Sequence, residues 1–138
     1  MEYKFKLPIQ IRFKDLDILG HVNASMYFTY FETTRLAFTA KVLGNINWNE
    51  RGMVVVNNEM NYKKPIYMQD QVICRIGVIE YGTTSMKVGV QICKIENNTE
   101  TLCAQGSCTL VCVDGRTQQV FKFPEEWKQK ISDFESSI

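Results

Sequence analysis

The sequence has little histidine, proline or tryptophan and contains no long apolar run. It contains one histidine, His21, and its five cysteines include no C-x-x-C pair. The ligand pattern of a structural zinc site is therefore missing. An odd number of cysteines argues against a disulfide framework; we expect small buried side chains and a cytoplasmic protein. No stretch approaches the ~20 apolar residues that span a membrane, and we expect no signal peptide in the charge-alternating N-terminus.

The chain also has no excess of charge of one sign. Sixteen Lys and Arg residues stand against 15 Asp and Glu residues, which gives a net charge of +1. No strong field would gather nucleic acid, and we expect none as a partner. What the sequence does have is 45% hydrophobic residues in a chain of 138, enough for a core. Without a linker or repeat, we expect one domain, residues 1–138.

Hydrophobic periodicity predicts the first two elements. Residues 9–13 (IQIRF) alternate, which predicts a strand that ends at Asp15 and buries Ile9, Ile11 and Phe13 on one face. A helix is predicted from about residue 24 to residue 43, with Gly44 as its C-terminal cap. Apolar residues cover most of the circumference of this helix, so we expect it to be buried nearly all round.

The second half of the chain predicts a sheet. Strand-like segments occur at residues 53–62, 71–81, 85–94 and 101–113, and the connections after residues 81 and 96 are short enough for antiparallel hairpins. A short amphipathic helix is expected after Pro124. The order strand, long helix, strands predicts an α+β fold in which an antiparallel sheet of five strands wraps around one central helix.

Polar residues crowd into the segment directly before the long helix. Asn23 is a suitable N-terminal cap, which would leave the Ala24 N–H free to polarise a carbonyl at the positive end of the helix. Gly20 permits a tight turn, so the carboxylate of Asp17 could face the same point as a nucleophile or as a base for water. The alternatives are an Asx-turn at Asp17 and a structural, hydrogen-bonded His21. Asp15 is expected at a solvated strand end.

Two segments carry a family resemblance. Residues 12–35, RFKDLDILGHVNASMYFTYFETTR, resemble the D-x-D-x-x-G-H-V-N-x-x-x-Y-x-x-Y-F-E-x-x-R signature of hotdog-fold acyl-CoA thioesterases of the 4-hydroxybenzoyl-CoA thioesterase type. Residues 62–72, YKKPIYMQDQV, are similar to the Y-x-x-P-x-x-x-x-D-x-[LVI] motif of that family. The chain departs from the family pattern at Leu16, Gln69 and Ala24-Ser25, and the last of these matters only if an Asn side chain helps to hold the loop.

The resemblance implies a fold, an activity and a site. It implies a hotdog fold and a homodimer or homotetramer, with acyl-CoA at the interface where two sheets join edge to edge. It implies hydrolysis of acyl-CoA without a metal or redox cofactor, with Asp17 as the catalytic acid and the Ala24 N–H as the donor to the carbonyl. Gly20, His21 and Asn23 match the loop that shapes the site in that family and are expected to bind substrate. Tyr27 is added because it lies near the helix start, and Lys63 and Lys64 because lysine binds phosphate.

The sequence leaves alternatives open for the activity, the catalytic acid and the phosphate-binding residues. An enzyme of the same fold could act on acyl carrier protein or as a dehydratase, and a non-catalytic protein could only bind acyl-CoA. Glu32 is a rival carboxylate, although an ion pair with Arg35 one helical turn away is favoured. Arg75 and Arg116 are further candidates for the CoA phosphates beside the two lysines. Strict alternation in residues 54–62 groups Val54 and Val56 with Asn58, Met60 and Tyr62 on one face.

Overall fold

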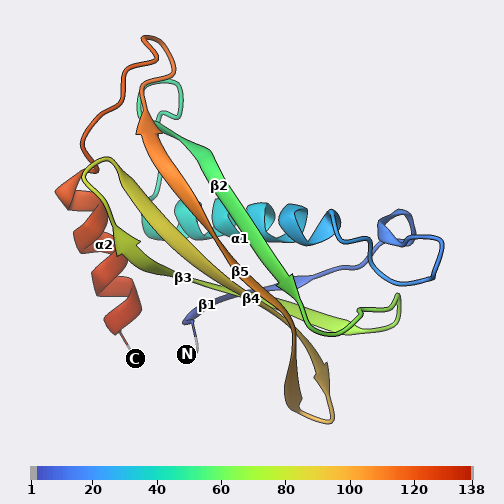
Figure 1. Ribbon diagram of the computed structural model, residues 1–138. Coiled ribbons are helices and arrows are strands. Elements are labelled where there is room, and N and C mark those ends of the chain that lie inside the picture. Colours follow the sequence, from blue (N-terminus) through green and yellow to red (C-terminus); the bar gives the residue numbers. More distant parts are fainter. Residues whose placement is uncertain (1–2, 138) are drawn as a thin grey trace.

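The computed structural model describes residues 3–137, which form one antiparallel sheet and two α-helices (Figure 1). The strand order β1-β3-β4-β5-β2 makes β1 and β2 the edges of the sheet. This arrangement is a hotdog fold and confirms the predicted fold class. In chain order the elements are β1 (Phe5–Ile9), a 3-10 turn (Phe13–Asp15), α1 (Met26–Val42), β2 (Gly52–Tyr62), β3 (Gln71–Tyr81), β4 (Ser85–Glu96), β5 (Thr99–Val113) and α2 (Glu125–Ser136).

The long helix α1 lies across one face of the sheet (Figure 1). Its buried side packs on apolar side chains of the strands, and it buries Phe31 completely. The opposite side is exposed at Thr29, Glu32 and Leu36, the last with 59% of its surface accessible. The expectation of a helix buried nearly all round is therefore wrong for the single chain, because the sheet covers only one side of it.

Both predicted hairpins are present, and the end of α1 and the start of α2 lie where the sequence predicts them, whereas α1 begins two residues later than predicted, at Met26. The β4–β5 hairpin turns through Asn97 and Asn98, whose φ angles of 51° and 62° lie in the left-handed region that Asn tolerates. Gly44, with φ 78°, follows the last residues of α1, which confirms it as the residue that ends the helix. α2 follows Pro124 and buries Trp127 and packs on the sheet and α1.

The first strand differs from the prediction. β1 pairs with β3 only as far as Ile9, and the chain then turns through the 3-10 segment instead of continuing as a strand to Asp15. Ile11 is buried as expected, but Phe13 is 81% exposed. The local alternation is overridden because Asp15 accepts hydrogen bonds from the backbone and guanidinium of Arg12 and so bends the segment between them.

A β-bulge also changes the faces of β2. Val55 pairs with Leu110 and Asn57 with Thr109, so Val56 is the extra residue. The bulge puts Val55, rather than Val54 and Val56, on the helix side of the sheet, where Val55 and Asn58 line one depression with residues of α1. Strict alternation therefore assigned the first half of this strand to the wrong face.

Asp15 is completely buried, which contradicts the expectation of a solvated strand end. Its carboxylate accepts hydrogen bonds from the Tyr30 hydroxyl at 2.7 Å and from the Arg12 N–H at 3.1 Å, and it forms an ion pair with the Arg12 guanidinium at 3.0 Å. Burial alone would raise the pKa of Asp15, but these hydrogen bonds and the Arg12 charge outweigh it and lower the pKa below its ordinary value of 3.8.

We predict that Asp15→Asn lowers the free energy of unfolding by an amount that depends on pH. A folded-state pKa below the unfolded value contributes stability that is present above about pH 4 and is lost as the pH falls through the folded pKa. The difference between wild type and Asp15→Asn should therefore be full at pH 7 and shrink below about pH 4. Urea unfolding at several pH values measures it; a difference that stays constant down to pH 2 would contradict the prediction.

Candidate functional site

The segment before α1 folds into a tight loop. The Asp17 N–H donates to the carbonyl of His21 at 2.9 Å, and the Gly20 N–H donates to the carbonyl of Asp17 at 3.0 Å. Gly20 has a φ of +86°, a conformation that side chains rarely adopt, which explains a glycine at this position. The Val22 N–H donates to the carbonyl of Ile66 at 2.8 Å, so the loop is joined to the segment that follows β2.

The predicted hydrogen bond to the Asn23 side chain is present, but the N-cap of α1 is Ser25, which makes no side-chain cap bond. The Asn23 side-chain oxygen accepts hydrogen bonds from the N–H and the hydroxyl of Ser25, at 3.0 and 2.9 Å. Regular helix begins three residues later, at Met26, whose N–H donates to the Asn23 carbonyl. Among residues 3–137, the Ala24 N–H has no hydrogen-bond partner. It is a free donor at the positive end of α1.

A cavity of about 390 Å³ opens beside this loop and the N-terminal end of α1. It brings together six of the eight site residues predicted from the sequence. Gly20 and Asn23 do not line the cavity; they shape the loop and the helix start that border it. The lining residues are Asp17, His21, Val22, Ala24, Tyr27, Tyr62, Lys63, Lys64 and Pro65.

The two carboxylate oxygens of Asp17 have different surroundings. One accepts the Leu19 N–H at 2.9 Å, which is an Asx-turn, as the structural alternative predicted. The other lies 3.6 Å from Nδ1 of His21. The side chain of Asp17 is 26% exposed, and the residue lines the cavity. The turn therefore fixes the carboxylate in place while it stays open to a ligand.

Two tyrosines form one wall of the cavity. Tyr27 is only 3% exposed, and its hydroxyl has no hydrogen-bond partner among residues 3–137. The same residues contain no fully enclosed side-chain polar atom without a partner, so this hydroxyl is open to the cavity that Tyr27 lines. Burial, followed by nearby negative groups that include Asp17, raises the pKa of Tyr27 to about 12. The phenol is thus neutral and able to donate at physiological pH.

Tyr62 belongs to the site, although it is not among the site residues predicted from the sequence. Its ring stands edge-on to the ring of Tyr27, with 5.0 Å between centroids. Its hydroxyl donates to the carbonyl of Ala24 at 2.9 Å and so ties the end of β2 to the first turn before α1. The signal was present in the sequence, because Tyr62 and Pro65 are the fixed positions of the Y-x-x-P motif.

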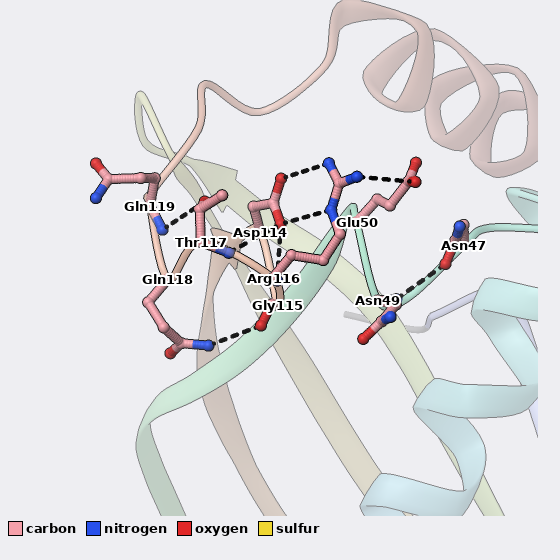
Figure 2. A network of polar contacts seen from close by, with 9 residues as sticks. All are labelled: Asn47, Asn49, Glu50, Asp114, Gly115, Arg116, Thr117, Gln118 and Gln119. Carbon is pink, nitrogen blue, oxygen red and sulfur yellow. Dashed lines mark hydrogen bonds and ion pairs between the residues drawn. The ribbon is translucent and has the colours of Figure 1, made fainter.

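The structure separates the four candidate cations. Lys63 and Lys64 line the cavity. Arg75 is 7% exposed and forms a salt bridge of 2.6 Å with Glu100. Arg116 lies at the other end of the molecule, in the connection after β5, where its guanidinium bonds to Asp114 and Glu50 at 3.2 Å (Figures 1 and 2). The two arginines therefore serve other contacts.

Glu32 opens onto a different depression, of about 260 Å³, between α1 and β2. Phe28, Arg35, Val55 and Asn58 also line it. In the described part of the chain Glu32 and Arg35 form no ion pair; the Arg35 guanidinium instead lies 4.7 Å from the centre of the Phe31 ring. The rival carboxylate is thus outside the cavity that holds Asp17 and Ala24.

The cysteines have the environment that the sequence predicts. All five cysteines are buried and free. Within residues 3–137 no cluster of three or more His, Cys, Asp or Glu side chains could hold a metal ion. Neither α1 nor α2 is long and apolar enough to cross a bilayer, and the same holds for every helix in this range.

Comparison with known proteins identifies the family. The model of the thioesterase-like superfamily matches residues 11–131. The long-chain acyl-CoA thioesterase FadM of Escherichia coli (strain K12) is 25% identical over 130 residues, which cover 89% of this chain and 93% of FadM. A thioesterase from Thermus thermophilus, solved with coenzyme A and Zn, is 26% identical, with a TM-score of 0.82 and coverage of 96% of this chain and 95% of that one.

A mutant of 4-hydroxybenzoyl-CoA thioesterase, solved with 4-hydroxybenzoyl-CoA, shares the fold at a TM-score of 0.83. It is only 13% identical, over 91% of this chain and 96% of that one, so it supports the fold alone. The superfamily match covers most of the sequence, including both motifs and every residue that lines the cavity. The chain therefore belongs to the thioesterase-like superfamily.

Proposed function

We propose that this protein hydrolyses acyl-CoA thioesters to a free carboxylate and CoA. The observation that carries the proposal is the cavity in which a fixed carboxylate, that of Asp17, and an unpaired N–H, that of Ala24, occur together. Acyl transfer needs these two groups: one to attack or to activate water, and one to stabilise the oxyanion. Membership of the superfamily and the names of FadM and the CoA-bound relative favour the same activity.

In the proposed reaction the thioester carbonyl oxygen accepts the Ala24 N–H. Either Asp17 attacks the carbonyl carbon to form an anhydride that water then hydrolyses, or it takes a proton from a water that attacks. In both routes the carbon–sulfur bond breaks, CoA leaves as the thiolate and the acyl group leaves as a carboxylate. The oxyanion donor is preorganised at a helix end, so little reorganisation accompanies the charge that develops. The proposal requires no metal or redox cofactor.

The remaining lining residues have proposed roles in binding. The Tyr27 hydroxyl donates to the bound substrate, because it is a neutral donor without a protein partner. Lys63 and Lys64 bind the CoA phosphates at the end of β2. His21, held next to Asp17 and edge-on to Tyr67 with 5.9 Å between ring centroids, forms the wall of the loop. A cytoplasmic location stays a prediction.

A dimer is part of the proposal. Among residues 3–137, β2 is an edge strand that pairs only with β5, and Val54, Val55 and Val56 on it are 41–57% exposed. Unpaired edges with apolar side chains are ready to pair with another chain. An isologous dimer would join two β2 edges and cover the exposed side of α1. Because β2 ends at Tyr62, the cavity would then lie next to the partner subunit.

We predict that Asp17→Asn lowers kcat for acyl-CoA hydrolysis by about 100-fold or more, because asparagine cannot act as nucleophile or base. Release of free thiol from short, medium, long and aromatic acyl-CoAs measures it, and the wild-type profile names the acyl class. Glu32→Gln is the matched control and should keep its activity. If Asp17→Asn stays active and Glu32→Gln does not, the catalytic acid lies on α1. If wild type hydrolyses no acyl-CoA, thioesters of acyl carrier protein are the next substrates to test.

We predict that Lys63→Ala and Lys64→Ala each raise KM for an acyl-CoA by about tenfold, the size of one lost charge-assisted contact. The same acyl group on N-acetylcysteamine lacks the phosphates, so its kcat/KM should not change. Higher salt should raise KM for the CoA thioester and leave KM for the N-acetylcysteamine thioester unchanged. Lys41→Ala, on the last turn of α1, is the control. An equal fall in kcat/KM with both thioesters would contradict a phosphate contact.

We predict that Val54→Lys converts the oligomer to monomers. Pairing of two β2 edges would bring the introduced lysines of the two subunits close together. Their charges would repel, and the apolar contact between the two valines would be lost. Sedimentation velocity of wild type, Val54→Lys and the control Val120→Lys measures the state; Val120 is likewise exposed, at 55%, but lies outside β2. A monomeric wild type, or an unchanged oligomer in Val54→Lys, would count against the dimer.

A further inference from the structure

The two acids of the D-x-D pair have opposite environments. Asp17 lines the cavity with a partly exposed side chain, whereas Asp15, two residues earlier, is completely buried. No part of Asp15 lines the cavity, so it cannot touch a substrate there. Its burial and its contacts nevertheless connect it to both groups on which the proposed reaction depends.

The side chain of Asp15 joins the start of the loop to the second turn of α1. One carboxylate oxygen accepts the Tyr30 hydroxyl at 2.7 Å and the Arg12 N–H at 3.1 Å. The other accepts Nε and Nη2 of Arg12 at 3.2 and 3.0 Å. Hydrogen bonds to a buried charge are strong and directional, so this arrangement holds the chain at residue 15 in one position relative to α1.

The backbone of Asp15 joins the two ends of the loop. Its carbonyl accepts the Asn23 N–H at 2.9 Å, so residue 15 holds the residue directly before Ala24. Further along the loop, the Asp17 N–H donates to the His21 carbonyl at 2.9 Å. The carboxylate of Asp17 and the N–H of Ala24 therefore project from two chain segments that are held together at Asp15.

We infer that Asp15 and Tyr30 are positioning residues: the buried hydrogen bond between them fixes Asp17 and the Ala24 N–H relative to each other and to α1. This inference rests on the proposed function, since it assigns the bond to the alignment of the proposed reactive groups. A misplacement of reacting groups by about 1 Å can lower the rate about 100-fold. Alignment of this kind acts on the transition state, so its loss lowers kcat more than it raises KM.

Tyr30→Phe is the test, because it removes one hydroxyl and keeps the buried ring. We expect kcat to fall about tenfold or more at a nearly unchanged KM. We also expect faster hydrogen exchange of the Asn23 amide, whose acceptor is the Asp15 carbonyl, while thermal unfolding shows that the protein remains folded at the assay temperature. Tyr81→Phe is the matched control: Tyr81 ends β3 and packs on Phe123, away from the loop, and should keep both kcat and exchange.

The outcomes separate this inference from the proposed function. If wild type is active and Tyr30→Phe keeps kcat within about twofold, or loses kcat only in proportion to its folded fraction, the positioning role is overturned and the proposed function stands. If wild type hydrolyses no thioester, the proposed function fails, and exchange decides whether the bond holds the loop. Unchanged exchange at Asn23 in Tyr30→Phe overturns the inference in that case as well.

Discussion

The buried carboxylate of Asp15 is the constraint on which the candidate site depends. A charged group with no exposed surface is tolerated only when hydrogen bonds and an opposite charge replace water, and here Tyr30 and Arg12 supply both. Each partner comes from a different element, so satisfying one carboxylate fixes the end of the first segment against α1. The loop that carries Asp17 then begins from a fixed point, although the loop itself lies at the surface.

The regular elements were predictable because their patterns are local. β3 has the predicted bounds, and the turns after residues 81 and 96, Gly44 and Pro124 marked element ends correctly. The errors occur where a side-chain contact or a strand register decides the outcome. The chain around Phe13 bends because Asp15 bonds to Arg12 and Tyr30, and the bulge at Val56 depends on how β2 registers with β5. Periodicity contains neither the Tyr30 contact nor the register.

The candidate site likewise has parts that local sequence predicts and parts that depend on contacts between distant segments. Asp17, His21 and Ala24 lie within eight consecutive residues. A turn and a helix start indicated that the Asp17 carboxylate could face the Ala24 N–H, and the family resemblance added His21; all three line one cavity. The choice among cations was not accessible from the sequence, because Arg75 is bound by Glu100 from another strand. The Y-x-x-P motif marked the position of Tyr62, but the bond from its hydroxyl to Ala24, 38 residues away in sequence, was likewise not accessible.

The proposed reactive groups and the facing wall of the cavity come from different segments of the chain. The carboxylate and the oxyanion donor come from one short segment whose geometry is fixed internally by Asp15, Gly20 and Asn23. The opposite wall consists of Tyr62, the last residue of the edge strand β2, and the three residues that follow it, whose position depends on the register of β2. Substitutions in that wall or at the β2 edge can alter the shape of the cavity without disturbing the Asp15 bonds. Under the proposed function, the reaction therefore depends on one segment of the chain and the shape of the substrate site on another.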